Sequence, residues 1–411
     1  MRQGTSSSSS NSSNSNSSSS KRCHFTRLLP PTPTRMPQGD SGRSRSTMNS
    51  SSSSSSNSSS SNSSSSNSSS SNSSSSSSNT IASTSVKAER FQQLLSRDVI
   101  DAGELRNLLW GGVPSCCSAE VRSDAWRIML GYLPLTRDRK DAALAKKRAD
   151  YQELVQHYYS RGEASAEEVK LLKQLRVDLP RTHAGRKFFA HPRIQLGMER
   201  ALFLWAVKHP ASGYVQGIND LLTPFVAVFL HAALGRDPEE LSIDEVDEKV
   251  LLQVEADSFW CLAKLLAHIQ DHYTFGQPGI RRLVVRLRDI VKRVDEGLYQ
   301  HLEDHGVDLL QVTFRWMNCL LMREFPLSCV IRLWDTYIAE QAEGFSDFHV
   351  YVCAVFLVNW SRQLKQMDFQ QMILFIQNFP TTTWGPQEIE TLLAEAFVLK
   401  SLYHSAPKHL N

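Results

Sequence analysis

The 411-residue sequence lacks the motifs that mark a self-contained nucleotide or hydrolase site. It has no GxxxxGK[ST] phosphate loop, no GxGxxG after a strand, no GxSxG nucleophile turn and no HExxH zinc motif. Each of these motifs sets backbone N–H groups, a nucleophile or metal ligands at the spacing that its chemistry needs. Their absence indicates that the chain binds no nucleotide by itself, and we expect no cofactor or metal of its own.

Paired cysteines and long apolar segments are also missing. The seven cysteines are an odd number without a CxxC pair, which predicts reduced thiols of a cytoplasmic protein and not disulfides or zinc ligands. The N-terminus has no apolar segment of the kind found in secretory signals. The most apolar runs, 221–234 and 350–358, are shorter than the roughly 20 residues that span a bilayer. We therefore expect any membrane association to be peripheral or through a partner.

The chain as a whole is slightly basic, but its charge is unevenly distributed. Of 45 Lys and Arg and 42 Asp and Glu residues, 9 and 2 lie in residues 1–90. Residues 91–411 therefore hold 36 basic and 40 acidic residues, a net charge of −4. A nucleic-acid-binding domain needs a basic face, so this balance argues against such a partner.

Serine and asparagine dominate residues 1–85, and these residues gain too little from burial to offset the conformational entropy lost on folding. We expect this low-complexity region to be disordered, with a basic, proline-containing island at 21–47. Within the island, Arg27, Pro30 and Pro33 fit a polyproline ligand of an SH3-type adaptor. A solvated basic linker is the favoured alternative, because such short patterns are common by chance.

Residues 86–411 have helical apolar spacing almost throughout. One example is the run Ile280, Leu283, Val284, Leu287, Ile290, Val291 and Val294. There are no convincing alternating strands and no repeat of 30–50 residues. The sequence predicts one large all-α domain.

One helical segment, HLEDH, has His301 and His305 four residues apart with carboxylates between them. That spacing can bind zinc, but the pattern matches neither HExxH nor HxxEH and no third ligand is suggested. A solvated polar helix face is the favoured interpretation, and an independent metalloenzyme is the least favoured function.

Three other stretches carry residues suited to recognition chemistry. Arg122 and Trp126 are one helical turn apart, so the guanidinium is expected to lie against the indole in a structural role. Pro180 is expected to push Leu179 out of the helical region and to place Arg181 on a stiffened, non-helical backbone. An arginine there suits phosphate or carboxylate recognition, although a surface ion pair is the default alternative.

The third stretch is Tyr214-Val-Gln216-Gly-Ile-Asn-Asp220, with Gly213 directly before it. Its glycines permit tight turns or close approach of another backbone. The side chain of Gln216 could orient a water molecule or bind the main chain of a partner.

In order, these stretches resemble the three fingerprint motifs of the TBC domain, the Rab GTPase-activating family: RxxxW, IxxDxxRT and YxQGxxD. Leu175 replaces the isoleucine of the second motif. The resemblance runs from about residue 105 to about 380, with a last helix to about 403, and includes the later segments RWMNCLLMREFP and IRLWDTY. It is most marked for the Gyp-type, Golgi-associated branch and its animal relatives.

The resemblance implies an all-α Rab-GAP domain whose partner is a GTP-bound Rab-family GTPase. Arg181 would be the arginine finger and Gln216 the glutamine finger, both acting in trans, while GTP and Mg²⁺ belong to the partner. The supporting residues would be Asp178, Thr182, Tyr214, Gly217, Asp220, Arg122 and Trp126. The protein would thus activate a GTPase without an active site of its own, in the cytoplasm or peripherally on Golgi membranes. The alternative is an inactive TBC-type scaffold that binds a Rab or another partner.

Overall fold

The structure is a computed structural model that describes residues 73–183 and 185–403. These residues fall within one unit, Ser68–Asn411. The proline-containing island at 21–47 and residues 1–72 of the Ser/Asn-rich region lie outside the described residues, so the expected disorder and the adaptor motif stay predictions.

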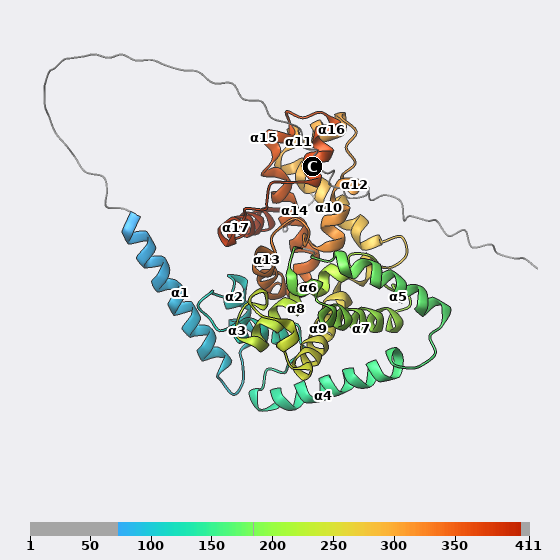
Figure 1. Ribbon diagram of the computed structural model, residues 1–411. Coiled ribbons are helices and arrows are strands. Elements are labelled where there is room, and N and C mark those ends of the chain that lie inside the picture. The colour runs from blue at the N-terminus through green and yellow to red at the C-terminus, as the bar shows by residue number, and fades with distance from the viewer. Residues whose placement is uncertain (1–72, 184, 404–411) are drawn as a thin grey trace, which may run out of the picture. The chain divides into compact units, whose positions relative to one another are not determined.

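Helices account for nearly all regular structure (Figure 1). The first nine are α1 Ser73–Leu95, α2 Ala102–Trp110, α3 Ala119–Met129, α4 Lys140–Leu154, α5 Ala166–Asp178, α6 Lys187–Ala190, α7 Pro192–Lys208, α8 Ile218–Leu234 and α9 Glu248–His268. The others are α10 Pro278–Val294, α11 Glu296–Asp304, α12 Leu309–Cys319, α13 Leu327–Ala339, α14 His349–Val358, α15 Ser361–Leu364, α16 Phe369–Gln377 and α17 Pro386–Tyr403. The described chain has no named strand and a single isolated bridge, Val99 with Thr136. The prediction of an all-α fold is confirmed.

Helix α8 forms the centre of the part of the fold that holds the three motifs. Every residue from Ile218 to Leu230 is buried, as expected for a helix that is apolar on all sides. It packs against α3, α7, α9, α12 and α13. Because the third motif runs into the first turn of α8, its polar side chains are held at one end of a rigid, fully surrounded element.

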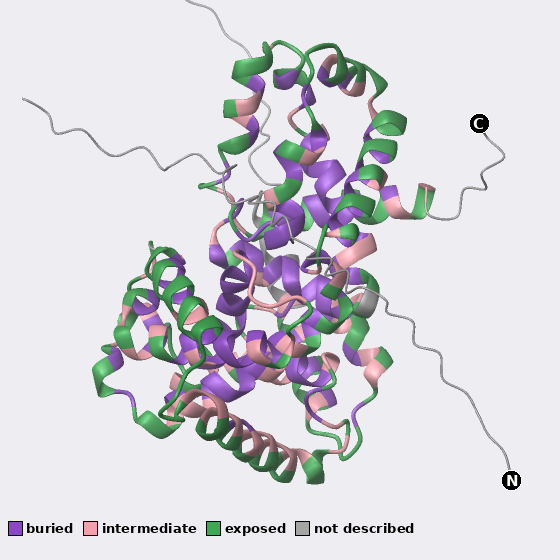
Figure 2. Ribbon diagram, turned by 90° about the vertical axis from the view of Figure 1, so that its right-hand side faces the viewer, coloured by how far each residue is buried: buried purple, intermediate pink, exposed green. Residues whose placement is uncertain are grey.

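A second buried helix, α14, organises the C-terminal part of the fold, and it packs against α10 and α17. Helix α10 is strongly amphipathic: Ile280, Leu287 and Val291 are buried, while Arg281 and Arg288 are exposed. Buried residues run through the middle of the part around α8 and of the part around α14, and exposed residues cover the outside (Figure 2). The periodicity of the 280–294 run therefore marked a true core-facing helix.

Helix α1 begins at Ser73, so the expected boundary between residues 85 and 86 falls inside a helix. Ala88, Phe91 and Leu94 are buried, and α1 packs against α2 and α3. Once such a face has nucleated a helix, each further residue adds at little cost, so the helix extends into the serine-rich segment. The domain boundary at 85–86 stays a prediction.

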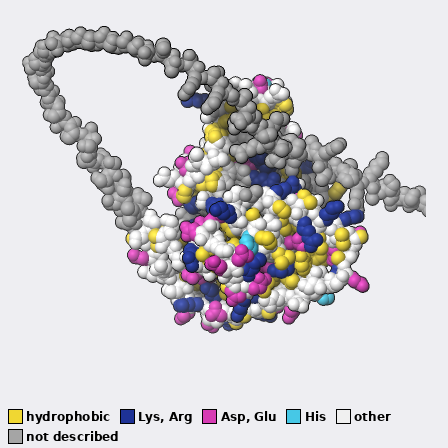
Figure 3. All heavy atoms as spheres, viewed as in Figure 1, with side chains coloured by type: hydrophobic (Ala, Val, Ile, Leu, Met, Phe, Trp, Pro, Cys, Tyr) yellow, Lys and Arg dark blue, Asp and Glu magenta, His cyan; other side chains and the backbone are white. Residues whose placement is uncertain are grey.

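On the face of the molecule seen in Figure 3, acidic, basic and hydrophobic side chains are mixed. Among the described helices, none combines the length and apolar character required to cross a membrane.

Candidate functional site

Asp178, at the C-terminal end of α5, connects the second and third motifs. Its side chain is fully buried. One carboxylate oxygen pairs with the guanidinium of Arg181, and the other accepts hydrogen bonds from the Tyr214 hydroxyl at 2.9 Å and the Gln174 amide at 3.0 Å. Helix α5 itself begins with a capping box between Ser165 and Glu168, which fixes the start of the element that presents Asp178.

Thr182 and Asn219 form a second connection between the same two motifs. The Thr182 hydroxyl donates to the main-chain carbonyl of Asp178 at 2.9 Å and accepts from the Asn219 amide at 2.8 Å. The Asn219 carbonyl oxygen accepts from the Gly217 N–H at 2.9 Å and lies 3.0 Å from the Tyr214 hydroxyl. Both Thr182 and Asn219 are buried, so the contacts are shielded from competing water.

Arg181 itself is the exposed member of this group, with 54% of its side chain accessible. It ends a 3-10 turn, Leu179–Arg181. The expectation that Pro180 would remove Leu179 from the helical region is wrong: Leu179 has φ −61° and ψ −45°, and its N–H still bonds to the Leu175 carbonyl. A proline near the start of a short 3-10 turn needs no N–H, and its fixed φ suits the turn. The tendency of a residue before proline to leave the helical region is therefore overridden here.

Gln216 is fixed through its main chain, while its side chain is left available. Its carbonyl accepts a 2.9 Å hydrogen bond from the Asn318 amide of α12. Gly217 follows with φ +115°, and a Cβ there would collide with the same amide and lie 3.1 Å from the Cys319 sulfur. Glycine is therefore required for both its φ and its close contact. Among the described residues, the side-chain amide of Gln216 has no hydrogen-bond partner.

Asp220 supports the glutamine segment from the other side. It is buried in the first turn of α8, and its carboxylate binds Arg323 Nε at 2.9 Å and a terminal guanidinium nitrogen at 2.7 Å. Arg323 follows α12, so this pair and the Asn318 contact bind α8 to the same neighbouring segment. The motif-based prediction omitted Asn219, which occupies an open position of the third motif, and Asn318, which lies outside the three motifs.

Burial shifts the pKa values of two groups at the site, Tyr214 and His183. Burial, and then the neighbouring Asp178, raise the pKa of Tyr214 well above its usual value. Tyr214 is therefore a neutral donor at physiological pH. Burial also lowers the pKa of His183, which has φ +46° and stacks on Phe189 just after the Arg181 turn.

Arg122 and Trp126 are joined differently from expected. They meet at the carboxylate of Asp335 in α13, which accepts from Arg122 Nε at 3.1 Å and from the indole N–H at 2.7 Å. The expected stacking of guanidinium on indole is thus replaced by a shared, fully buried acid, because a buried carboxylate needs several donors. The Val113 N–H donates to the same carboxylate at 3.0 Å. The first motif binds α3 to α13, and it makes no contact with Asp178.

The HLEDH segment belongs to the end of α11 and makes structural contacts. His301 Nε2 lies 3.0 Å from the Met367 carbonyl, and His305 Nδ1 lies 2.8 Å from the His301 carbonyl. In residues 73–183 and 185–403, no group of three or more His, Cys, Asp or Glu side chains is arranged to hold a metal ion. The described cysteines are free thiols, and Cys261, Cys319, Cys329 and Cys353 are buried.

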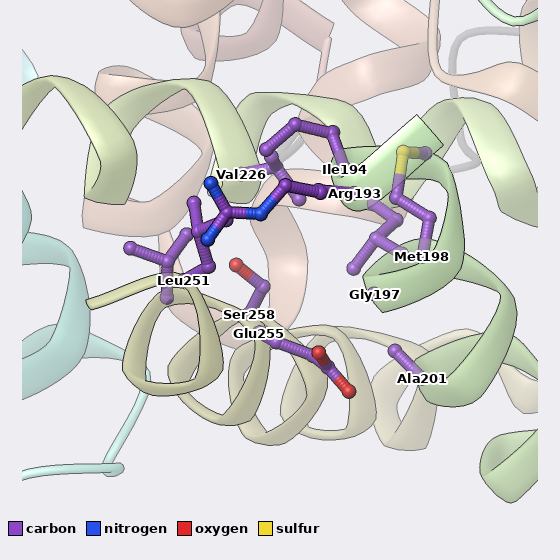
Figure 4. A pocket seen from close by; sticks show the side chains of 11 residues that line it. Arg193, Ile194, Gly197, Met198, Ala201, Val226, Leu251, Glu255 and Ser258 are labelled. Carbon is purple, nitrogen blue, oxygen red and sulfur yellow. The ribbon is translucent and has the colours of Figure 1, made fainter. Parts of the chain in front are cut away.

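One interior cavity lies between α7, α8 and α9 (Figure 4). Glu255 and Ser258 project from α9 towards α7 in this view. The cavity measures only about 20 Å³, enough for about one water molecule. Glu255 is bound there by Arg200 and Tyr151, so the cavity serves packing and is not a substrate site.

Comparison with known proteins gives this geometry a context. Residues 119–365 match the family model of the Rab-GTPase-TBC domain. The human protein "TBC1 domain family member 22B" is 48% identical over 325 residues, covering 79% of this chain and 63% of its own length. The Schizosaccharomyces pombe protein "GTPase-activating protein gyp1" is 46% identical over 326 residues, covering 79% and 63%.

A solved structure is similar over the same region. The crystal structure of the Ypt/Rab-GAP domain of Gyp1p superimposes with a TM-score of 0.72 at 41% identity, covering 78% of this chain and 99% of that one. The chain spans about 63% of the length of the two curated relatives above.

Proposed function

Because this chain belongs to the Rab-GTPase-TBC domain family, we propose that it accelerates GTP hydrolysis by a Rab-type small GTPase. The observation that carries the proposal is the buried network of Asp178, Tyr214, Thr182 and Asn219. It joins the Arg181 turn to the Gln216 segment. The side chain of Arg181 is exposed, and Gln216 is partly exposed. The described relative from S. pombe is itself named a GTPase-activating protein.

In this mechanism the protein supplies two side chains in trans. The guanidinium of Arg181 moves next to the terminal phosphate of the partner's GTP and neutralises charge that develops during phosphoryl transfer. The amide of Gln216 orients the attacking water. GTP and Mg²⁺ remain with the partner, so the chain needs no nucleotide loop of its own.

The remaining site residues hold the two segments in position. A finger residue contributes only if it is held close to its productive geometry, since misplacement by about 1 Å can cost roughly 100-fold in rate. Asp178 and Tyr214 join the two segments, Gly217 lets α12 approach, and Asp220 anchors the first turn of α8 through Arg323. Arg122 and Trp126 act farther away, on the packing of α3 against α13.

Stimulated hydrolysis by a panel of GTP-loaded Rabs tests the proposal. Arg181→Ala should lower kcat/KM for the stimulated reaction by about 10³-fold or more, and Gln216→Ala should also lower it strongly. Arg139→Ala is the matched control, because Arg139 is likewise an exposed arginine at the end of a 3-10 turn. Undiminished stimulation by the Arg181 variant would refute the finger assignment.

The same panel separates an activator from a scaffold. Binding of a Rab without stimulation by the wild type would favour the inactive scaffold. As an activator, the protein would control a step of vesicle trafficking, from the cytoplasm or peripherally on Golgi membranes as the Gyp-type resemblance implies. Fractionation of cells expressing the full chain checks that location.

A further inference from the structure

A second, larger cavity lies apart from the Arg181 and Gln216 side chains and has a volume of about 650 Å³. We call it the basic cavity, because four cationic side chains line it: Lys87 of α1, Arg122 of α3, Arg186 just before α6, and Arg332 of α13. The carboxylates in its lining are Asp237 and Glu390. A volume of this size is typical of sites for small organic ligands.

Two adjacent glycines allow two of these cations to lie together. A Cβ on Gly111 would be 2.7 Å from the Lys87 ammonium, and one on Gly112 would be 2.7 Å from the Arg332 Cδ. Gly112 also has φ +79°, which favours glycine. The turn after α2 therefore gives Lys87 and Arg332 room to approach the same stretch of backbone from two different helices.

The positive charges of the basic cavity are only partly balanced. Arg122 is paired with Asp335, and Arg332 lies 3.4 Å from Glu390 and donates to Thr336. Lys87 and Arg186 form no ion pair among the described residues. Asp237 is occupied in capping the Glu239 N–H. Burial, and then the neighbouring Arg332, lower the pKa of Lys87, while Asp335 and Glu390 act in the opposite direction.

We propose that the basic cavity binds a phosphate monoester on a small polar body, such as an inositol phosphate, free or as a lipid headgroup. A phosphate monoester carries a charge of about −1.5 to −2 and three acceptor oxygens, which matches two unpaired cations beside two guanidinium groups. The volume of the cavity exceeds that of a lone phosphate, so we expect a ligand in which the phosphate is attached to a larger polar group. The site is separate from GTPase activation, because neither Arg181 nor Gln216 lines it.

Calorimetric titration of the full chain with an inositol trisphosphate tests the proposal, together with cosedimentation on phosphatidylcholine vesicles with and without phosphatidylinositol bisphosphate. Lys87→Gln should weaken binding roughly 10- to 100-fold, the loss expected for one charge-assisted hydrogen bond. Arg90→Gln removes the same charge from an exposed position on the same helix and should leave binding unchanged. Arg186→Gln serves as a second variant if the Lys87 variant does not fold.

The outcomes distinguish the sources of the ligand. Binding of the free trisphosphate supports a soluble ligand, and binding to the bisphosphate vesicles alone supports a headgroup. No binding in either assay, or equal losses in the Lys87 and Arg90 variants, would overturn the proposal. Binding of only a phosphoserine peptide from residues 1–72 would overturn it too, in favour of a segment of the chain itself.

An independent readout comes from thermal unfolding without ligand. Because Lys87 forms no ion pair among the described residues and is partly buried, Lys87→Gln should unfold at the wild-type temperature or above, and the trisphosphate should raise the Tm of the wild type more than that of the variant. A lower Tm for the unliganded variant would instead assign Lys87 a structural role and contradict the proposal.

Discussion

The Tyr214 hydroxyl and the Asp178 carboxylate, 36 positions apart in the chain, are 2.9 Å apart in the fold. This hydrogen bond is a direct side-chain connection between the segment that carries Arg181 and the segment that carries Gln216. Asp178 is fully buried and Tyr214 is partly buried, which makes the bond stronger than an exposed one. The geometry of the two segments should therefore depend on it.

Tyr214→Phe removes this hydroxyl and keeps the ring. We expect a loss of about 1.5–3 kcal/mol in the free energy of unfolding, because a hydrogen bond to a carboxylate is lost. Stimulated GTP hydrolysis should fall by roughly 10- to 100-fold as the finger segments lose their alignment. Tyr299→Phe, at a half-buried tyrosine whose ring faces Lys292, is the control for activity and denaturant unfolding. Equal activity in the two variants would contradict a positioning role for Tyr214.

Gly217→Ala should damage both stability and activity. The new Cβ would enter the space of the Asn318 amide, at a φ that side-chain-bearing residues rarely adopt. Such strain costs about 1–3 kcal/mol, and the Asn318 contact that holds the Gln216 carbonyl would be lost. Gly162→Ala, where a Cβ meets nothing within 4 Å, is the matched control in unfolding and hydrolysis assays. A Gly217 variant as stable as that control would disprove the close contact.

Asp335→Ala tests the assembly of the first motif. The change leaves the Arg122 guanidinium, the Trp126 indole N–H and the Val113 N–H without their shared acceptor. Loss of one partner of a buried ion pair typically costs about 3–5 kcal/mol. Chemical denaturation should show a loss in this range, whereas Glu303→Ala, at an exposed acid, should show none. A small effect at Asp335 would mean that the first motif contributes little to the packing of α3 on α13.

The buried histidines predict a loss of stability in mild acid. Burial lowers the pKa of His349 to about 3 and that of His272 to about 4, from 6.5. His349 lies 2.8 Å from the Tyr337 hydroxyl and 3.1 Å from the Trp316 carbonyl, contacts suited to a neutral ring. The unfolded state thus binds more protons between about pH 6 and 4, so the free energy of unfolding decreases as pH falls, by about 1.4 kcal/mol per unit for each histidine.

His349→Gln should flatten this dependence, because the titrating group is removed while an amide remains. Denaturant unfolding at several pH values measures the slope. His268→Gln, at an exposed histidine, should retain the wild-type slope. Identical slopes in all three proteins would show that His349 is not buried in its neutral form.

The sequence alone predicted those features that depend on residues close together in the chain. The helical period of residues 280–294 depends on neighbours three and four residues apart, and the structure confirms it as α10. Asp178, Arg181 and Thr182 are close because they share one turn. The resemblance to the family added Tyr214, whose hydroxyl binds Asp178 in that turn, and Gln216, which lies two residues further along the chain.

Contacts between distant segments could not be predicted in the same way. Asn318 reaches the Gln216 carbonyl across 102 positions, and Asp335 binds Arg122 across 213. No periodicity encodes such pairs, since they depend on how α12 and α13 cross their neighbours. The prediction for Leu179 failed for a different reason. A local rule about proline predicted that Leu179 leaves the helical region, but α5 continues into a 3-10 turn and Leu179 stays helical.

The ion pair between Arg181 and Asp178 has a consequence for how the proposed activator would distinguish its partner's two nucleotide states. When Arg181 leaves Asp178 to act as a finger, it gives up its carboxylate partner and leaves that fully buried carboxylate without its guanidinium, a cost that another anion taking the place of the carboxylate beside Arg181 would offset. The terminal phosphate of GTP offers that replacement, and GDP does not. The resting pair would thus make insertion of the arginine depend on the presence of the phosphate that is to be removed, and it would favour release of the partner after hydrolysis.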